Sequence, residues 1–361
     1  GIEDSINGIK AGHAAGMKVI HIPDTIEIND DIRELTSVVC HSLSDVPDII
    51  DTWNEGKVVD VEGYYENAKI NRVYVDRVHV KKTFAEYTAA YNADDPKIKL
   101  KIDHTYRVAA LCERIAKAAG MCAYDVELAW LSGMLHDVGR FEQIKRYNTF
   151  SDADSVDHAK FGADLLFKDG LISTFLNGMV KCTGYKPGAL EDRYGSDGVF
   201  LYDRLNKSDM EMLELAIRCH NMYRIPQGLN RREQAFCNVL RDADKVDIFK
   251  VNIDTPLEEI YNTTTEELMK SDITDEVLEA FDEEHCILKA IRRTPADTVI
   301  GHVSLAYELV YDESVRITVE QGYLAKLMHF HSDNEETNRK MAMVREKMDS
   351  YVKKRIVEKD A

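Results

Sequence analysis

The helical spacing of apolar residues after Thr83 constrains the fold of this chain more than any other feature. In the stretch KIDHTYRVAALCERIAKAAG, apolar side chains recur on one face of a helix, and a glycine follows them. These apolar residues are Val108, Leu111, Cys112, Ile115 and Ala119. The pattern is typical of an amphipathic helix that ends at the glycine. Similar spacing predicts helices at 158–168, 208–221 and 231–249. We therefore expect a mainly α protein, built as a helical bundle.

The chain before Thr83 has a different pattern. A short β-branched segment at 18–22 predicts a buried strand beside a helix, 38–40 predicts another strand, and 46–53 predicts another helix. We assign 1–56 to a small α/β segment on these grounds. Alternating residues at 57–83, clearest in the letters VYVDRVHV, predict a β-rich connector.

The helical remainder is divided into a domain at 84–250 and an extension at 251–361. Within the extension, 266–284 contains nine acidic residues and one lysine, a net charge of −8, which predicts solvated helix faces. A later stripe at helical spacing predicts a core or docking surface. It consists of Met341, Val344, Met348 and Tyr351.

Composition argues against several classes of function. The 46 basic and 64 acidic residues give a formal net charge of −18, which disfavours binding to long nucleic acids. No run approaches the roughly 20 apolar residues that span a bilayer, so no membrane association is expected. The seven cysteines are scattered and include no CxxC pair, which favours a reduced, cytoplasmic protein. The sequence does not indicate the oligomeric state.

Histidines and aspartates in the helical part form a candidate metal-binding set. They are His104, His136, Asp137, His158, His220 and Asp244. Each carries an imidazole or a carboxylate, the usual ligands of divalent metals. His136 and Asp137 are adjacent in MLHDVGR, and neighbours on a helix diverge by about 100°. Both can reach one ion only if the helix ends there, which the nearby Gly139 allows.

The set resembles the HD-domain superfamily of metal-dependent phosphohydrolases. The family pattern is a lone His, an adjacent His-Asp pair and a distant Asp, here His104, His136–Asp137 and an Asp of RDADKVD. In the family a residue pair and a second Asp follow the last ligand, which selects Asp244 over Asp242. The resemblance covers about 83–250 and implies a helical bundle that holds a divalent metal.

Two further segments resemble dinuclear members of this superfamily. The segment DHAKFGADLLF resembles the element that supplies a ligand to a second metal, which implies this role for His158. The segment IRCHNMYRIPQGL resembles the corresponding region of HD-GYP phosphodiesterases and places His220 at its first histidine. Asn221 stands where that region has a second histidine, and the GYP triplet is absent, so specificity for cyclic dinucleotides is not expected.

The resemblance implies hydrolysis of a phosphomonoester or phosphodiester, either a nucleotide or another small phosphate ester. One or two divalent ions are expected, and mixed His/Asp ligation favours Mn, Fe, Co, Ni or Zn, with Mg possible. Asp137 could bridge two ions, and Arg140, Lys160 and Lys245 could neutralise phosphate oxygens as part of the catalytic machinery. The alternative is a metal-binding regulatory module without turnover.

The first residues resemble a different family. The segment GIEDSINGIKAGHAAGMKVIHIPD is similar to the last motif of haloacid-dehalogenase-like (HAD-like) phosphatases, particularly the β-phosphoglucomutase-like group. In that family an acidic pair holds magnesium, which implies Glu3 and Asp4 here. The family's nucleophile motif would precede Gly1, so we expect 1–56 to be the end of such a domain or a structural remnant. Phosphatase or mutase activity in a longer parent protein is a further alternative.

Overall fold

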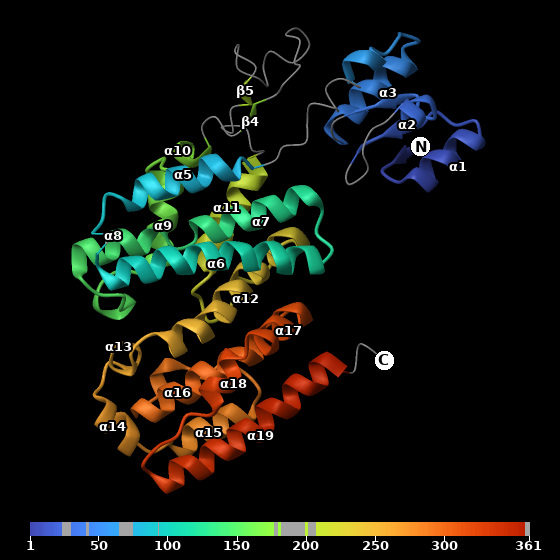
Figure 1. Cartoon of the computed structure of the whole chain (residues 1–361). Coiled ribbons are helices and arrows are strands. Elements are labelled where there is room, and N and C mark those ends of the chain that lie inside the picture. Colours follow the sequence, from blue (N-terminus) through green and yellow to red (C-terminus); the bar gives the residue numbers. More distant parts are fainter. Residues whose placement is uncertain are drawn as a thin grey trace. The chain divides into compact units, whose positions relative to one another are not determined.

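The computed structural model describes residues 1–23, 30–40, 43–64, 75–92, 94–176, 180–181, 199–200 and 207–357 (Figure 1). The chain divides into two compact units. The first unit comprises 1–90, 121–128 and 165–211, and the second comprises 91–120, 129–164 and 212–361. Helices account for most of the described residues, so the predicted mainly α fold class is confirmed.

The N-terminal part of the first unit is a small α/β arrangement. Its three parallel strands lie in the order β1-β2-β3, with Ile20 in register with both Ile2 and Val38. These strands are β1 (Ile2–Glu3), β2 (Ile20–His21) and β3 (Val38–Val39), and the helices are α1 (Ile6–Ala14), α2 (Asp30–Glu34) and α3 (Val46–Asn54). The strands predicted at 18–22 and 38–40 and the helix predicted at 46–53 are thus confirmed.

The β-rich interpretation of 57–83 is wrong where it can be compared with the structure, because helix α5 (Arg77–Thr88) occupies its last part. The Asp76 carboxylate caps this helix by accepting hydrogen bonds from the backbone N–H groups of Val78 and His79, each at 3.0 Å. In a strand, Val78 and Val80 would share a face. In the helix Val80 is buried and Val78 is 79% exposed. Residues 65–74 lie outside the described residues.

The rest of the first unit contains short elements. Helix α10 (Ile172–Leu176) packs against α5, and strands β4 (Val180–Lys181) and β5 (Val199–Phe200) form an antiparallel pair. The unit also takes in the start of α7 (Ala123–Leu135) and of α11 (Lys207–Cys219), two helices that continue into the second unit.

Two long helices organise the second unit. Helix α6 (Pro96–Ala118) begins at the capping residue Asp95 and ends before Gly120, whose φ of 72° makes it the predicted stop. It packs along α12 (Arg231–Asp254). Helices α8 (Val138–Tyr147) and α9 (His158–Ala163) pack on each other beside this pair, and a π-helical turn (Asp164–Lys168) follows α9. The predicted helices at 158–168, 208–221 and 231–249 therefore exist with slightly different ends.

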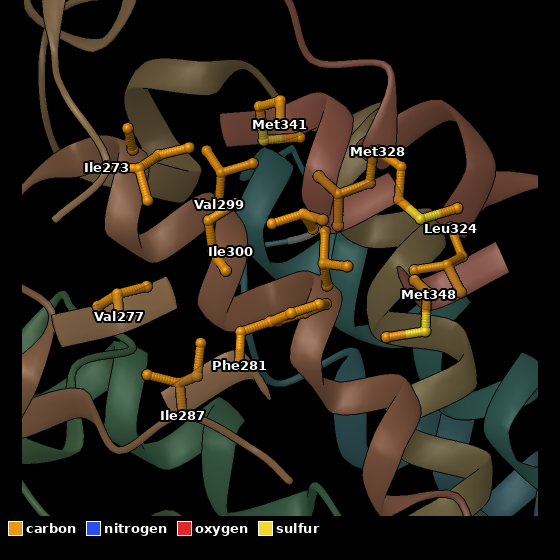
Figure 2. Close-up of a cluster of buried hydrophobic side chains, with 14 of the residues drawn as sticks. Ile273, Val277, Phe281, Ile287, Val299, Ile300, Leu324, Met328, Met341 and Met348 are labelled. Carbon is orange, nitrogen blue, oxygen red and sulfur yellow. The ribbon is translucent and has the colours of Figure 1, made fainter. Parts of the chain in front are cut away.

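The C-terminal helices share a separate apolar core within the second unit (Figure 2). They are α13 (Leu257–Tyr261), α14 (Thr265–Lys270), α15 (Asp275–Asp282), α16 (Pro295–Val303), α18 (Tyr323–Met328) and α19 (Glu335–Val357). Helix α17 (Asp312–Gln321) contributes no residue to this core and packs against α12, α18 and α19. Met341, Val344 and Met348 on α19 are buried in this core, as the stripe predicted. The nine acids of 266–284 are all exposed, so the prediction of solvated helix faces is also confirmed.

The domain boundary predicted at 250 falls inside α12, which continues to Asp254 before the C-terminal helices begin. Among the described helices, none combines the length and the apolar character needed to cross a membrane. Among the described residues no disulfide joins any two of the six cysteines, and Cys182 lies outside these residues.

Two methionines on α19 provide a test of this core. Met348 is fully buried, whereas Met343 is 41% exposed. Met348→Ala leaves a cavity, so we expect it to lower the free energy of unfolding by about 2–5 kcal/mol in urea denaturation. Met343→Ala is the matched control and should change it by less than about 0.5 kcal/mol. Equal effects of the two substitutions would contradict this placement of α19.

Candidate metal centre

All six residues predicted as metal ligands lie together in the second unit, although they come from distant parts of the sequence. His104 lies on α6, His136 and Asp137 at the junction of α7 and α8, His158 at the start of α9, His220 just after α11, and Asp244 on α12.

The junction between α7 and α8 allows His136 and Asp137 to reach the same cluster. Asp137 has φ −106° and ψ 14°, so the helical backbone is interrupted at this residue, as the adjacent pair required. Gly139 then lets α8 approach α9 closely: a Cβ there would lie 2.4 Å from the carbonyl oxygen of His158 and 2.7 Å from the nitrogen of Gly162. A glycine at this position thus sets where His158 lies.

Backbone carbonyls orient two of the histidines. The Nδ1 atom of His136 lies 2.7 Å from the carbonyl oxygen of Gly133, and that of His220 lies 2.7 Å from the carbonyl oxygen of Ile217. A carbonyl can only accept, so Nδ1 carries the proton in each ring. The neutral forms therefore present a lone pair at Nε2.

Carboxylates orient the other two histidines. The Nδ1 atom of His104 donates to Asp247 at 2.6 Å, and that of His158 donates to Asp152 at 2.7 Å. Arg107 holds the Asp247 carboxylate through two hydrogen bonds of 2.6 and 2.9 Å. Carboxylate–histidine pairs of this kind are typical of metal sites, where they fix the ring and raise the basicity of its other nitrogen.

The four Nε2 atoms face one another in two pairs. His104 Nε2 lies 3.3 Å from His136 Nε2, and His158 Nε2 lies 3.1 Å from His220 Nε2. Two lone pairs at this distance repel unless a proton or a metal cation lies between them. Two imidazoles on one tetrahedral zinc ion, with bonds of about 2.0–2.1 Å, would place their nitrogens about 3.4 Å apart. The donor set thus fits a bound divalent metal.

The carboxylate of Asp137 lies between the two pairs. Its Oδ2 atom is 3.6 Å from Nε2 of both His104 and His136, and its Oδ1 atom is 3.6 Å from Nε2 of His158 and 3.8 Å from Nε2 of His220. Each oxygen therefore faces a different histidine pair, the arrangement that a bridging carboxylate needs.

Asp244 completes the first of two candidate positions. Its Oδ1 atom lies 3.2 Å from His104 Nε2 and 4.0 Å from His136 Nε2. We call the group of His104, His136, Asp244 and Oδ2 of Asp137 the first position. The second position is the group of His158, His220 and Oδ1 of Asp137.

Burial and charge favour the protonation states that bind metals. Burial lowers the pKa of both His158 and His220 to about 4, and the charge of Arg140 adds to this effect at His158, so both rings are neutral at neutral pH. Burial alone would raise the pKa of Asp137, but nearby positive charge, that of Lys101 foremost, holds it well below its ordinary value. Neutral imidazole and ionised carboxylate are the forms that bind a metal.

His104 differs from the other histidines. Burial opposes a charge on its ring, yet hydrogen bonds with Asp244 and Asp247 raise its pKa. A proton on Nε2 would satisfy Asp244, and a metal cation in the first position would satisfy the same carboxylate.

The cations predicted to neutralise phosphate lie in different surroundings. The Nη1 atom of Arg140 donates to Gln143, to the carbonyl of Phe150 and to Asp152 at 2.7–2.9 Å, while its Nε lies 3.8 Å from Asp137 Oδ1. Lys160 is more than half exposed, and its Nζ lies 2.9 Å from Asp157.

Lys245 follows Asp244 on α12 and forms no hydrogen bond or ion pair with any described residue; burial lowers its pKa. Asp242, which the family pattern passed over, accepts hydrogen bonds from the backbone of Val310 and Tyr311 and from Ser314 instead of facing the histidines.

Glu3 and Asp4 lie at the end of β1, in the first unit. They belong to no cluster of three or more potential ligands among the residues that the structure describes. The HAD-like role of this pair stays a prediction.

Sequence reasoning missed several residues of the site. Lys101 donates to Asp137 Oδ2 at 2.7 Å, and Asp247 and Asp152 orient histidines. Asn221 donates to Asp152 and Asp157, at 3.3 and 2.9 Å, so it supports the carboxylate behind His158. Lys101 lies three residues before His104 and thus on the same face of a helix, a signal that could have identified it.

A comparison with known protein families supports part of this assignment. The family model described as HD domain matches residues 102–249, which include every residue of the two positions. No curated protein and no solved structure matches the chain.

Asp247 allows a test of the histidine orientation. Asp247→Asn removes the acceptor charge behind His104, so we expect metal affinity to fall about 10- to 100-fold in a calorimetric titration with Mn²⁺. The matched control is Asp254→Asn, on the same helix but about half exposed and paired with Lys250. An unchanged affinity in the Asp247 variant, with its helical circular dichroism retained, would contradict the proposed orientation.

Proposed function

We propose that this protein is a metal-dependent phosphohydrolase that acts on a small phosphate ester. The observation that carries the proposal is the placement of Asp137 between two pairs of histidines whose Nε2 atoms are free to bind metal. The match of residues 102–249 to the HD domain supports it, because that family consists generally of metal-dependent phosphohydrolases.

The donor set would hold one divalent ion at each position, with Asp137 available to both. Four imidazoles and two carboxylates suit Mn, Fe, Co, Ni or Zn better than Mg, which prefers oxygen ligands. When bound, such ions polarise a phosphoryl oxygen and lower the pKa of a bound water.

The residues of the chain prepare the site for this chemistry. Asp247 and Asp152 hold the imidazoles of His104 and His158 in place, so little reorganisation is needed when a substrate arrives. The histidine side chains are at most 5% exposed, whereas those of Lys101, Arg140 and Asp244 are 13%, 15% and 20% exposed. These three residues are therefore the members of the site that are more open to solvent, and to a substrate.

Charge points to a small anionic substrate. Lys101 and Arg140 lie beside the two oxygens of Asp137, and both can neutralise oxygens of a phosphate. The net charge of −18 disfavours a long polyphosphate backbone but not a single phosphate ester. A nucleotide or another small phosphomonoester or phosphodiester fits these conditions.

Asp137 provides the decisive variant for this function. Asp137→Ala removes a ligand from both positions, so we expect hydrolysis of p-nitrophenyl phosphate, bis-p-nitrophenyl phosphate and a nucleotide panel to fall more than about 100-fold. Bound metal, measured by atomic emission, should fall with it.

Asp154→Ala is the matched control, because Asp154 is an exposed carboxylate in the short turn Asp152–Asp154. It should retain both activity and metal. The assignment would be overturned if the Asp137 variant hydrolysed every substrate of the unsubstituted protein at the same rate as that protein.

A further inference from the structure

Lys160, Arg140 and Lys101 are cations near the site, and their partners distinguish them. Lys160 is paired with Asp157 and faces solvent. One Nη atom of Arg140 is shared among three acceptors, which fix its guanidinium against the loop that follows α8. Lys101 has no such fixing partners: among the described residues its ammonium donates only to Asp137.

Lys101 lies at the edge of the first position. It precedes His104 by about one turn of α6, and its Nζ lies 2.7 Å from Asp137 Oδ2, the oxygen that faces His104 and His136. The ring of Phe150 lies 5.4 Å from Nζ and covers one side of the ammonium. The ammonium charge of Lys101 thus lies beside the first position.

With a divalent ion bound, the charges around the first position would sum to a positive value, which favours binding of an anion. Asp247 is balanced by Arg107, so it adds no net charge. Asp137 and Asp244 together balance one divalent ion, and Lys101 is then in excess. An ammonium has three donors, of which Asp137 takes one, so the others can reach an oxygen at the same edge.

We propose that Lys101 binds a non-bridging oxygen of the substrate's phosphate and is a catalytic residue of this enzyme. The inference rests on the proposed function and extends it, because it assigns phosphate recognition to a lysine on α6. A charge-assisted hydrogen bond of this kind places the phosphoryl group against the first position and neutralises its charge. Arg140 lies beside Oδ1 of Asp137, the carboxylate oxygen that belongs to the second position.

Binding of inorganic phosphate tests this role without relying on turnover. We would load the full chain with Mn²⁺, measure its metal content and titrate it with inorganic phosphate by calorimetry. For Lys101→Met we expect phosphate affinity about 10- to 100-fold weaker than in the parent, the loss of one hydrogen bond between charged groups. Its metal content should stay unchanged.

Two matched variants accompany this measurement. Lys101→Arg keeps the charge and should retain most of the phosphate affinity, and Lys99→Met changes an exposed lysine on the same helix and should match the parent. In hydrolysis of p-nitrophenyl phosphate, Lys101→Met should lower kcat/KM by a factor similar to the loss in phosphate affinity. Lys101→Arg should keep kcat/KM near the value of the unsubstituted protein.

Three results would overturn the proposal. The first is a phosphate affinity of Lys101→Met equal to that of the parent. The second is a Lys101→Met variant that loses metal but binds phosphate with unchanged affinity at those sites that still hold Mn²⁺. This result would show that Lys101 only neutralises the charge of Asp137. The third is absence of phosphate binding by the metal-loaded parent. A parent that hydrolyses no phosphoester but binds phosphate through Lys101 would contradict the proposed function while supporting this role.

Discussion

The buried carboxylate of Asp137 is the interaction on which the rest of the site depends. Moving an ionised carboxylate out of water costs several kcal/mol unless positive charge and hydrogen bonds compensate for it. Lys101 and Arg140 supply positive charge at its two oxygens. The four surrounding imidazoles present lone pairs, because their Nδ1 protons point outward to carbonyls and carboxylates. A cluster so rich in acceptors needs cations to balance it, which fits the proposed metal centre.

Helix α12 connects this centre to the C-terminal helices. Asp244 faces the first position, Asp247 orients His104, and Asp242 accepts hydrogen bonds from the backbone that leads into α17. Residues two and five positions apart on a helix point in different directions, so one helix carries all three contacts. The C-terminal extension after residue 250 therefore helps to hold the helix that carries Asp244.

The fold class and the candidate ligands could be predicted from the sequence because both depend on local spacing. Apolar periodicity determines which face of a helix is buried, and six ligand-type residues in one spaced set are unlike a chance pattern. The helix α5 was missed because VYVDRVHV alternates as a strand does, and only the cap at Asp76 favours a helix. Asp152 and Asp247 act through side chains that folding brings against His158 and His104, which spacing alone does not indicate.

The most direct test of this account is anomalous X-ray scattering from crystals of the protein purified without chelators and supplied with Mn²⁺ or Zn²⁺. The account predicts two peaks on opposite sides of the Asp137 carboxylate, one beside His104 and His136 and the other beside His158 and His220. Such peaks would place each oxygen of the carboxylate beside a different ion. A single peak, or the absence of any peak within the histidine cluster, would contradict it.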